Sequence, residues 1–183
     1  MSVFKDKAIV LKVDKIAEKD LLYTIFSYDY WKLKVSKKFS KKEKNIDLGY
    51  IINFEIITKE NVSIHKIKNV KIKSEFNLEN KRTFSEINIF LEILSLIYKE
   101  SVIWIQNKEI FHLVEEINKK ENIDKTKLIL AKLKAKAIFW ILNIENSDLI
   151  ISKILKFVFH NKITDIFKLK WITSELEEIL EKL

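Results

Sequence analysis

The stretch Val62–Phe76, which reads VSIHKIKNVKIKSEF, decides the fold that we expect for the first part of the chain. Its apolar residues alternate with polar ones, as they do in a strand with one buried face. The alternation changes phase twice. Ile64 has an even number and Ile67 an odd one, and from Val70 on the apolar positions are even again. Such slips are typical of β-bulges, so this stretch predicts a long strand that bends at a corner of a small barrel.

Four shorter strands are expected before this one. They are rich in β-branched and aromatic residues, and they are Lys7–Val13, Leu21–Ser27, Trp31–Ser36 and Tyr50–Thr58. Tyr28–Tyr30 and Lys59–Asn61 are short enough to be hairpin turns. Five strands in about 75 residues predict a barrel of the oligonucleotide-binding (OB) type, which we assign to residues 1–78.

The remainder of the chain has the period of helices. Around Asn77–Lys81 the apolar spacing changes from 2 to 3.6, and Thr83 and Glu86 then form a capping-box signature. The expected helices begin at a capping residue or carry one apolar stripe, and they are Thr83–Tyr98, Lys108–Lys120, Asp124–Leu142, Asp148–His160 and Ser174–Leu183. We therefore predict an α+β protein in which an all-α helical domain, residues 79–183, follows the barrel.

The chain has 183 residues, of which 48% are apolar and 33% charged, a composition typical of a folded protein. No run approaches the roughly 18 to 20 apolar residues that span a bilayer. The N-terminal residues MSVFKDKAIV lack the features of a signal peptide. We therefore expect a cytoplasmic protein with no membrane contact.

Composition also excludes several kinds of reactive site. The chain has no cysteine, which excludes disulfides, thiol nucleophiles and zinc sites built from cysteine. Gly49 is the only glycine, which excludes a glycine-rich phosphate-binding loop. His65, His112 and His160 are dispersed and lack the spacing of metal ligands. We therefore expect no catalytic residue, no metal, no cofactor and no enzyme activity.

Most of the net positive charge lies in one window, residues 31–44, which reads WKLKVSKKFSKKEK. Seven lysines stand there against one glutamate, whereas the net charge of the whole chain is +8. A cationic strand and loop on an OB-type barrel favours phosphate binding, although a solvated loop that only aids solubility is the alternative. The candidate nucleic-acid-binding residues are Lys32, Lys34, Lys37, Lys38, Phe39, Lys41, Lys42 and Lys44.

Aromatic rings near this window are candidates for stacking on bases. Phe39 lies between lysine pairs, outside any strand pattern, and Tyr28 and Tyr30 lie in the first hairpin turn. Tyr50 is a further candidate, whereas Trp31 shares a face with apolar residues and is expected in the core. Because the chain has almost no arginine, we expect contacts to phosphates without readout of bases.

In order and spacing, several segments resemble the bacterial RecO family of recombination mediators. They are KAIVLKVDKIAEKDLLYTIFS (7–27), WKLKVSKK (31–38), IHKIKNVKIKSEF (64–76), LILAKLKAKAIFWILNI (128–144) and the closing segment 151–183. Three departures stand out. Lys37 and Lys38 occupy a segment that normally contains glycine, Asn143–Asp148 replaces a four-cysteine zinc region, and the chain stops at Leu183, short of the usual basic tail.

The resemblance implies a mediator that binds single-stranded DNA, and double-stranded DNA as a further ligand, and that helps RecA to load or strands to anneal. It implies a RecR-like partner and the acidic tail of single-stranded DNA-binding protein as a second partner. For that tail we assign Lys125, Lys132 and Lys136, which fall on one side of the third helix and for which a solvated face is the alternative. An OB-fold RNA-binding or translation-associated protein and a protein-interaction scaffold remain alternative functions.

Overall fold

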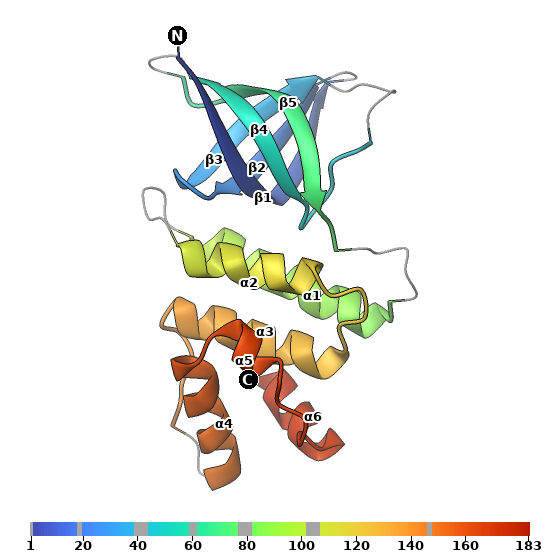
Figure 1. Ribbon diagram of the computed structural model, residues 1–183, viewed down its shortest axis with the longest axis vertical. Coiled ribbons are helices and arrows are strands. Elements are labelled where there is room, and N and C mark those ends of the chain that lie inside the picture. The colour runs from blue at the N-terminus through green and yellow to red at the C-terminus, as the bar shows by residue number, and fades with distance from the viewer. Residues whose placement is uncertain are drawn as a thin grey trace. The chain divides into compact units, whose positions relative to one another are not determined.

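The structure is a computed structural model, shown in Figure 1. It describes residues 2–17, 20–38, 44–58, 62–76, 82–101, 107–145 and 148–183. Two compact units make up the chain: Met1–Phe76 with Ile97–Glu115, and Asn77–Leu96 with Glu116–Leu183. The expected domain boundary at residue 78 lies outside the described residues, and the segment Ile97–Glu115 belongs to the same unit as the strands.

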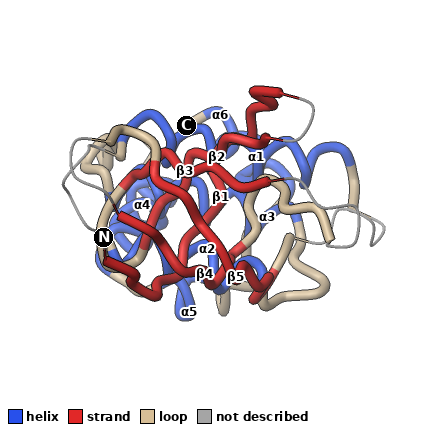
Figure 2. Tube along the Cα trace, turned by 90° about the horizontal axis from the view of Figure 1, so that it is seen from above, coloured by secondary structure: helices blue, strands red, loops and turns tan. Residues whose placement is uncertain are grey.

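The first unit is built around five strands. They are β1 (Ser2–Ala17), β2 (Asp20–Ser27), β3 (Lys32–Lys38), β4 (Ile51–Thr58) and β5 (His65–Ser74). They close in the order β1-β2-β3-β5-β4, with β3 and β5 parallel and the other pairs antiparallel. In the view from above (Figure 2), β2 and β3 lie side by side, and so do β4 and β5. The α+β class and the OB-type barrel predicted from the sequence are confirmed.

β1 is longer at both ends than its apolar run, Lys7–Val13, predicts. Its first half, up to Ile9, pairs with β4, and its second half, from Ala8 on, pairs with β2. Because both strands take up the backbone hydrogen bonds of β1, charged residues at its ends remain in the ladder although their side chains are not buried. Alternate side chains fill the barrel, including Ala8, Val10, Tyr23, Ile25, Val35, Ile52 and Phe54.

The phase slip between Ile67 and Val70 is a bulge, as predicted, whereas Ile64 precedes β5, which begins at His65. Glu55 of β4 pairs with Lys68, and Asn53 pairs with Lys71, so β5 has one residue more than β4 between these pairs. Asn69 lies in this interval with φ of 52°, a backbone conformation that asparagine tolerates better than most residues. The bulge moves the inward positions of β5 from odd to even numbers, which is the shift that the sequence shows.

Gly49 stands where β4 is about to begin, with φ of 74°. Its amide donates to the carbonyl of Val10 at 2.8 Å, and the amide of Val10 donates to the carbonyl of Tyr50 at 2.9 Å. The only glycine of the chain therefore lies where a left-handed backbone conformation is required.

Two helices contribute residues to both units: α1 (Phe84–Glu100) and α2 (Lys108–Asn118). The predicted capping box is confirmed, because the Thr83 amide donates to Glu86 Oε2 at 2.9 Å and the Glu86 amide donates to Thr83 Oγ1 at 3.2 Å. In the first unit, Glu115 of α2 binds the barrel through Lys73 Nζ, at 2.6 Å from its Oε1.

The second unit contains α3 (Lys125–Ile138), α4 (Leu149–His160), α5 (Ile163–Ile166) and α6 (Ser174–Lys182). The caps at Asp124 and Asp148 are confirmed, whereas α6 is capped by Thr173, one residue before the predicted Ser174. The short helix α5 was not predicted, because one turn is too short to show a helical period.

α3 ends four residues before the predicted Leu142. Trp140 takes φ of 60°, its amide donates to Ala137, and the Ile141 amide donates to Lys136. This is the Schellman arrangement that terminates many helices, usually with glycine at the left-handed position. The apolar stripe continues past Ile138, which is why the sequence pattern overran the end of the helix. In the described parts of the chain, no helix has both the length and the apolar character needed to cross a membrane.

Candidate nucleic-acid interface

β3 presents the described lysines of the basic window on two sides. Val35 is buried in the barrel, and Lys34 and Lys38 lie on the outer side and are exposed. Neither Lys34 nor Lys38 has a carboxylate partner among the residues that the structure describes. Lys37 is half-buried at the end of the strand. The two exposed ammonium groups can therefore meet a phosphate without first breaking an ion pair.

Two other lysines of the window are engaged within the first unit. Lys32 donates to the backbone carbonyl of Tyr98 at 2.9 Å, and burial lowers its pKa. Lys44 is 2.7 Å from Glu75 Oε2. Because both ammonium groups already have partners within the protein, each is less available to a ligand than that of Lys34. Phe39, Lys41 and Lys42, the other candidates of the window, lie outside the described residues.

The register of the barrel adds a cation that the sequence window does not contain. Lys12 of β1 pairs with Thr24 of β2, and Thr24 pairs with Lys34 of β3. Since neighbouring strands are about 4.8 Å apart, Lys12 and Lys34 lie on one outer face about 10 Å from each other. Lys12 also pairs with Asp14 at 2.9 Å. Lys15, exposed near the end of β1, pairs with Leu21 of β2 and therefore lies on the opposite side of the strand from Lys12.

We call Lys12, Lys34 and Lys38 the β1–β3 face. The strand 2–3 surface is where OB folds bind oligonucleotides. Lys34 and Lys38 lie on the β3 part of this surface, and Lys12 lies on the neighbouring strand β1. Sequence reasoning found Lys34 and Lys38 but missed Lys12. That residue is separated from the window by β2, and only strand pairing brings it to the same side of the sheet.

The aromatic candidates differ in how far their rings are covered by other side chains. Tyr28 is covered by two ammonium groups, with Lys7 Nζ 3.8 Å and Lys108 Nζ 4.8 Å from its ring centre. Tyr50 packs against the barrel core, and burial raises its pKa. Trp31, expected in the core, is half-buried.

Tyr30 and Trp31 form a row with Phe4, a residue that sequence reasoning did not single out. The ring centres of Phe4 and Tyr30 are 6.2 Å apart, and those of Tyr30 and Trp31 are 6.0 Å apart, each pair edge to face. Phe4 is 44% exposed although it lies in a strand. We call these three residues the aromatic row. Exposed aromatic rings are the side chains on which the bases of single-stranded nucleic acids stack.

The turn that carries Tyr30 is held by a buried carboxylate. Asp6 accepts hydrogen bonds from the hydroxyl of Ser27 and, at 2.7 Å, from the amide of Lys7. The Ser27 hydroxyl in turn accepts from the Tyr30 amide at 3.0 Å. Burial raises the pKa of Asp6, and the hydrogen bond from Ser27 opposes this shift. Asp6 thus connects β1 to the turn between β2 and β3.

The three lysines assigned to an acidic tail have partners within the second unit. Lys132, only 8% exposed, donates to the Glu181 carbonyl at 2.8 Å, and Lys136 donates to the carbonyl of Leu183. Lys125 pairs with Glu181 at 2.7 Å. Lys132 and Lys136 therefore neutralise the C-terminal end of α6, where a helix dipole is negative. Binding of an acidic tail at these residues stays a prediction.

Two further observations bear on chemistry. The only histidine contact with an acidic group in the described residues is that of His112, 3.4 Å from Glu115. No group of three or more side chains that could ligate a metal comes together in the same residues.

In comparisons with known proteins, no family model matches the chain, and no curated protein matches it.

Proposed function

We propose that the protein binds single-stranded nucleic acid through the β1–β3 face of its barrel, without reading sequence. The observation that carries this proposal is the pair Lys34 and Lys38, exposed on the outer side of β3 and without carboxylate partners in the described part of the chain. On a strand 2–3 surface of OB type, such cations neutralise phosphates and release condensed counterions. Lysine offers a point charge rather than a planar fork, so contact with phosphates is favoured over contact with base edges.

The resemblance to the RecO family supports a role in recombination and repair. In this proposal the protein is a cytoplasmic mediator that acts stoichiometrically and performs no catalysis. The barrel holds single-stranded DNA, and the helical part contacts a RecR-like protein and the acidic tail of single-stranded DNA-binding protein. Remodelling of the coat on single strands then allows RecA to load or complementary strands to anneal.

A titration of fluorescent oligonucleotide tests the site. The variant Lys34→Glu/Lys38→Glu should lower affinity at least tenfold at about 50 mM salt, because two favourable phosphate contacts become repulsive. The matched control is Lys153→Glu/Lys156→Glu, which makes the same change of charge at two exposed residues of α4. Equal losses of affinity in the two variants would mean that only the net charge of the protein matters, and would contradict the assignment of the binding site to the β1–β3 face.

Two outcomes would redirect the proposal. In competition between DNA and RNA strands of equal length, a strong preference for RNA would favour an RNA-binding or translation-associated protein, since an OB-type face can serve either polymer. Retained capture of a RecR-like partner without any salt-dependent binding of nucleic acid would favour a protein-interaction scaffold.

A further inference from the structure

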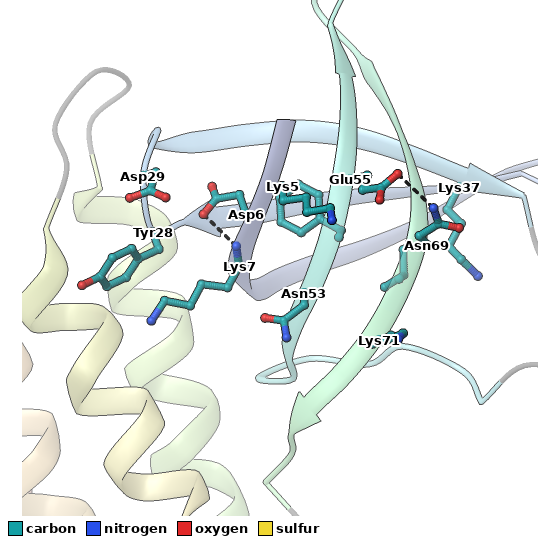
Figure 3. Close-up of a pocket in the computed structure, with 12 residues that line it drawn as sticks. Lys5, Asp6, Lys7, Tyr28, Asp29, Lys37, Asn53, Glu55, Asn69 and Lys71 are labelled. Atoms are coloured by element: carbon teal, nitrogen blue, oxygen red, sulfur yellow. Dashed lines mark hydrogen bonds between the residues drawn. The ribbon is translucent and has the colours of Figure 1, made fainter. Parts of the chain in front are cut away.

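A second cationic surface lies on the barrel, at an open groove of about 850 Å³ that Figure 3 shows in close-up. Residues of β1, β4 and β5 line it together with the turn after β2. Lys5 and Lys7 of β1 pair with Glu55 and Asn53 of β4, and Asn53 pairs with Lys71 of β5. These side chains alternate with core residues such as Ala8 and Ile52, so they point outward.

The acidic groups of the groove are mostly committed to the fold. Asp6 is held by Ser27 and the amide of Lys7. Glu55 accepts from the side-chain amide of Asn69 at 2.9 Å and lies 3.7 Å from Lys68 Nζ. By contrast, the structure pairs none of Lys5, Lys7 and Lys71 with a carboxylate in the ranges that it describes. The groove therefore presents more uncompensated positive than negative charge.

One end of the groove concentrates positive charge on a single ring. Lys7 extends to Tyr28, and its ammonium is 3.8 Å from the ring centre (Figure 3). Lys108, from α2 in the same unit, places its ammonium 4.8 Å from that centre. The ring stabilises each cation, but the two cations repel one another. An anion placed between them would remove this repulsion.

The aromatic row adjoins this end of the groove. Tyr30 follows Asp29, and Phe4 lies two residues before Asp6 on the same side of β1; Asp29 and Asp6 both line the groove. Phosphate-sized anions need only the lysines, and acidic peptides need only charge. A single strand, which carries phosphates and unpaired bases together, is the ligand that matches both features.

We propose that the groove is a second contact surface for a single-stranded nucleic acid. The lysines Lys5, Lys7, Lys71 and Lys108 hold the backbone, and Phe4 of the aromatic row stacks on a base. This inference rests on the proposed function and extends it to a second surface of the same barrel. β1 carries cations of both surfaces, with Lys12 on one and Lys5 and Lys7 on the other.

The test uses oligothymidylate of about 20 nucleotides and the full chain. Lys5→Glu/Lys71→Glu should lower affinity about tenfold at about 50 mM salt and reduce the slope of log affinity against log salt by about one to two. Both residues are exposed, so the variant should retain its fold, which circular dichroism checks. Lys153→Glu/Lys156→Glu again controls for net charge.

Two more variants separate the chemistry of the ligand. Phe4→Ala should weaken binding of the single strand about tenfold and leave binding of a duplex of equal length unchanged, because paired bases cannot stack on the ring. Asp29→Asn removes a negative charge at the rim and should tighten binding two- to threefold, a gain that misfolding cannot imitate.

The outcomes distinguish this inference from the proposed function. If Lys34→Glu/Lys38→Glu abolishes binding while the groove variants match wild type, the face is supported and the groove is overturned. If the groove variants lose binding while the face variant does not, the groove is supported and the β1–β3 face fails. No binding by wild type overturns both. If Lys5→Glu/Lys71→Glu weakens capture of an oligoglutamate peptide but not of the oligonucleotide, the groove binds acidic protein and this inference fails.

Discussion

At the scale of single residues, a few side chains stabilise backbone segments that lie outside helices and strands. Asp6 does so for the turn after β2, through the hydroxyl of Ser27. Arg82 does so in the second unit, where its guanidinium donates to the carbonyls of Lys120, Glu121 and Ile123 at 3.0 to 3.1 Å. The planar guanidinium has five N–H donors and can reach three carbonyls at once, which a lysine ammonium does less well. This is a physical reason for arginine at this position in a chain whose other basic residues are lysines.

Asp6 gives a prediction on pH. Burial raises the pKa of its carboxyl above the ordinary 3.8, so the folded state binds this proton more tightly than the unfolded state. Its contribution to stability is therefore complete below pH 3.8 and is lost as the pH rises through the raised pKa. Relative to wild type, Asp6→Asn should become progressively more stable from about pH 3 to pH 7 in urea unfolding. A flat difference between the two proteins, or the same trend in the exposed control Asp20→Asn, would contradict this account.

Arg82 gives a prediction on stability. Arg82→Lys keeps the charge but leaves carbonyls of the α2–α3 connection without a donor, and should cost about 1–3 kcal/mol of unfolding free energy. Chemical denaturation measures the loss. Lys162→Arg, the reverse exchange at an exposed position, should stay within about 0.5 kcal/mol. If the two variants are equally stable, the three hydrogen bonds contribute little.

At the scale of elements, periodicity predicted which segments become strands and helices, and tertiary contacts set where they end. β1 runs beyond its apolar centre because β2 and β4 both pair with it. α3 stops at Ile138 although apolar residues continue, because the backbone turns left-handed at Trp140. Three predicted helix caps are confirmed at the predicted residues: Asp124, Asp148 and the Thr83–Glu86 box.

The bulge of β5 can be tested through Asn69. Its φ of 52° suits asparagine or glycine and is strained for a β-branched residue. Asn69→Gly should therefore be close to wild type in stability, losing only the exposed hydrogen bond to Glu55, whereas Asn69→Val should lose about 1–3 kcal/mol. Thermal unfolding compares them, with Lys71→Val as the control in regular strand geometry. Equal stability of the glycine and valine variants would contradict the bulge.

At the scale of the whole molecule, the cations that share a surface differ from the lysines that are neighbours in the sequence. Of the described lysines in the basic window, Lys32 and Lys44 are bound within the first unit, while β1 supplies Lys12 from a distant part of the chain. Lysines of α3 that look like a solvated row instead bind the end of α6. Net charge alone therefore gives no reliable count of the cations that a ligand meets.

Salt dependence measures that count. If Lys12, Lys34 and Lys38 act together with Lys41 and Lys42 of the window, about five phosphates are neutralised. The slope of log affinity against log salt for a short single strand should then be about −3 to −4. Fluorescence titrations between about 25 and 200 mM salt give this slope. A slope near zero would show that binding, if any, is not electrostatic.

The sequence by itself determined the α+β class, the order of the strands and the longer helices, the bulge of the last strand and the caps at Thr83, Asp124 and Asp148, because these follow from periods and signals within a few residues. It also located Lys34 and Lys38 through the charge of one window. Only the tertiary structure decided which other cations share a surface, since Lys12 meets Lys34 across β2 and Lys7 meets Lys71 across β4. It likewise decided which lysines are occupied. Strand register and the carbonyl ends of distant helices control these placements, and neither leaves a local pattern.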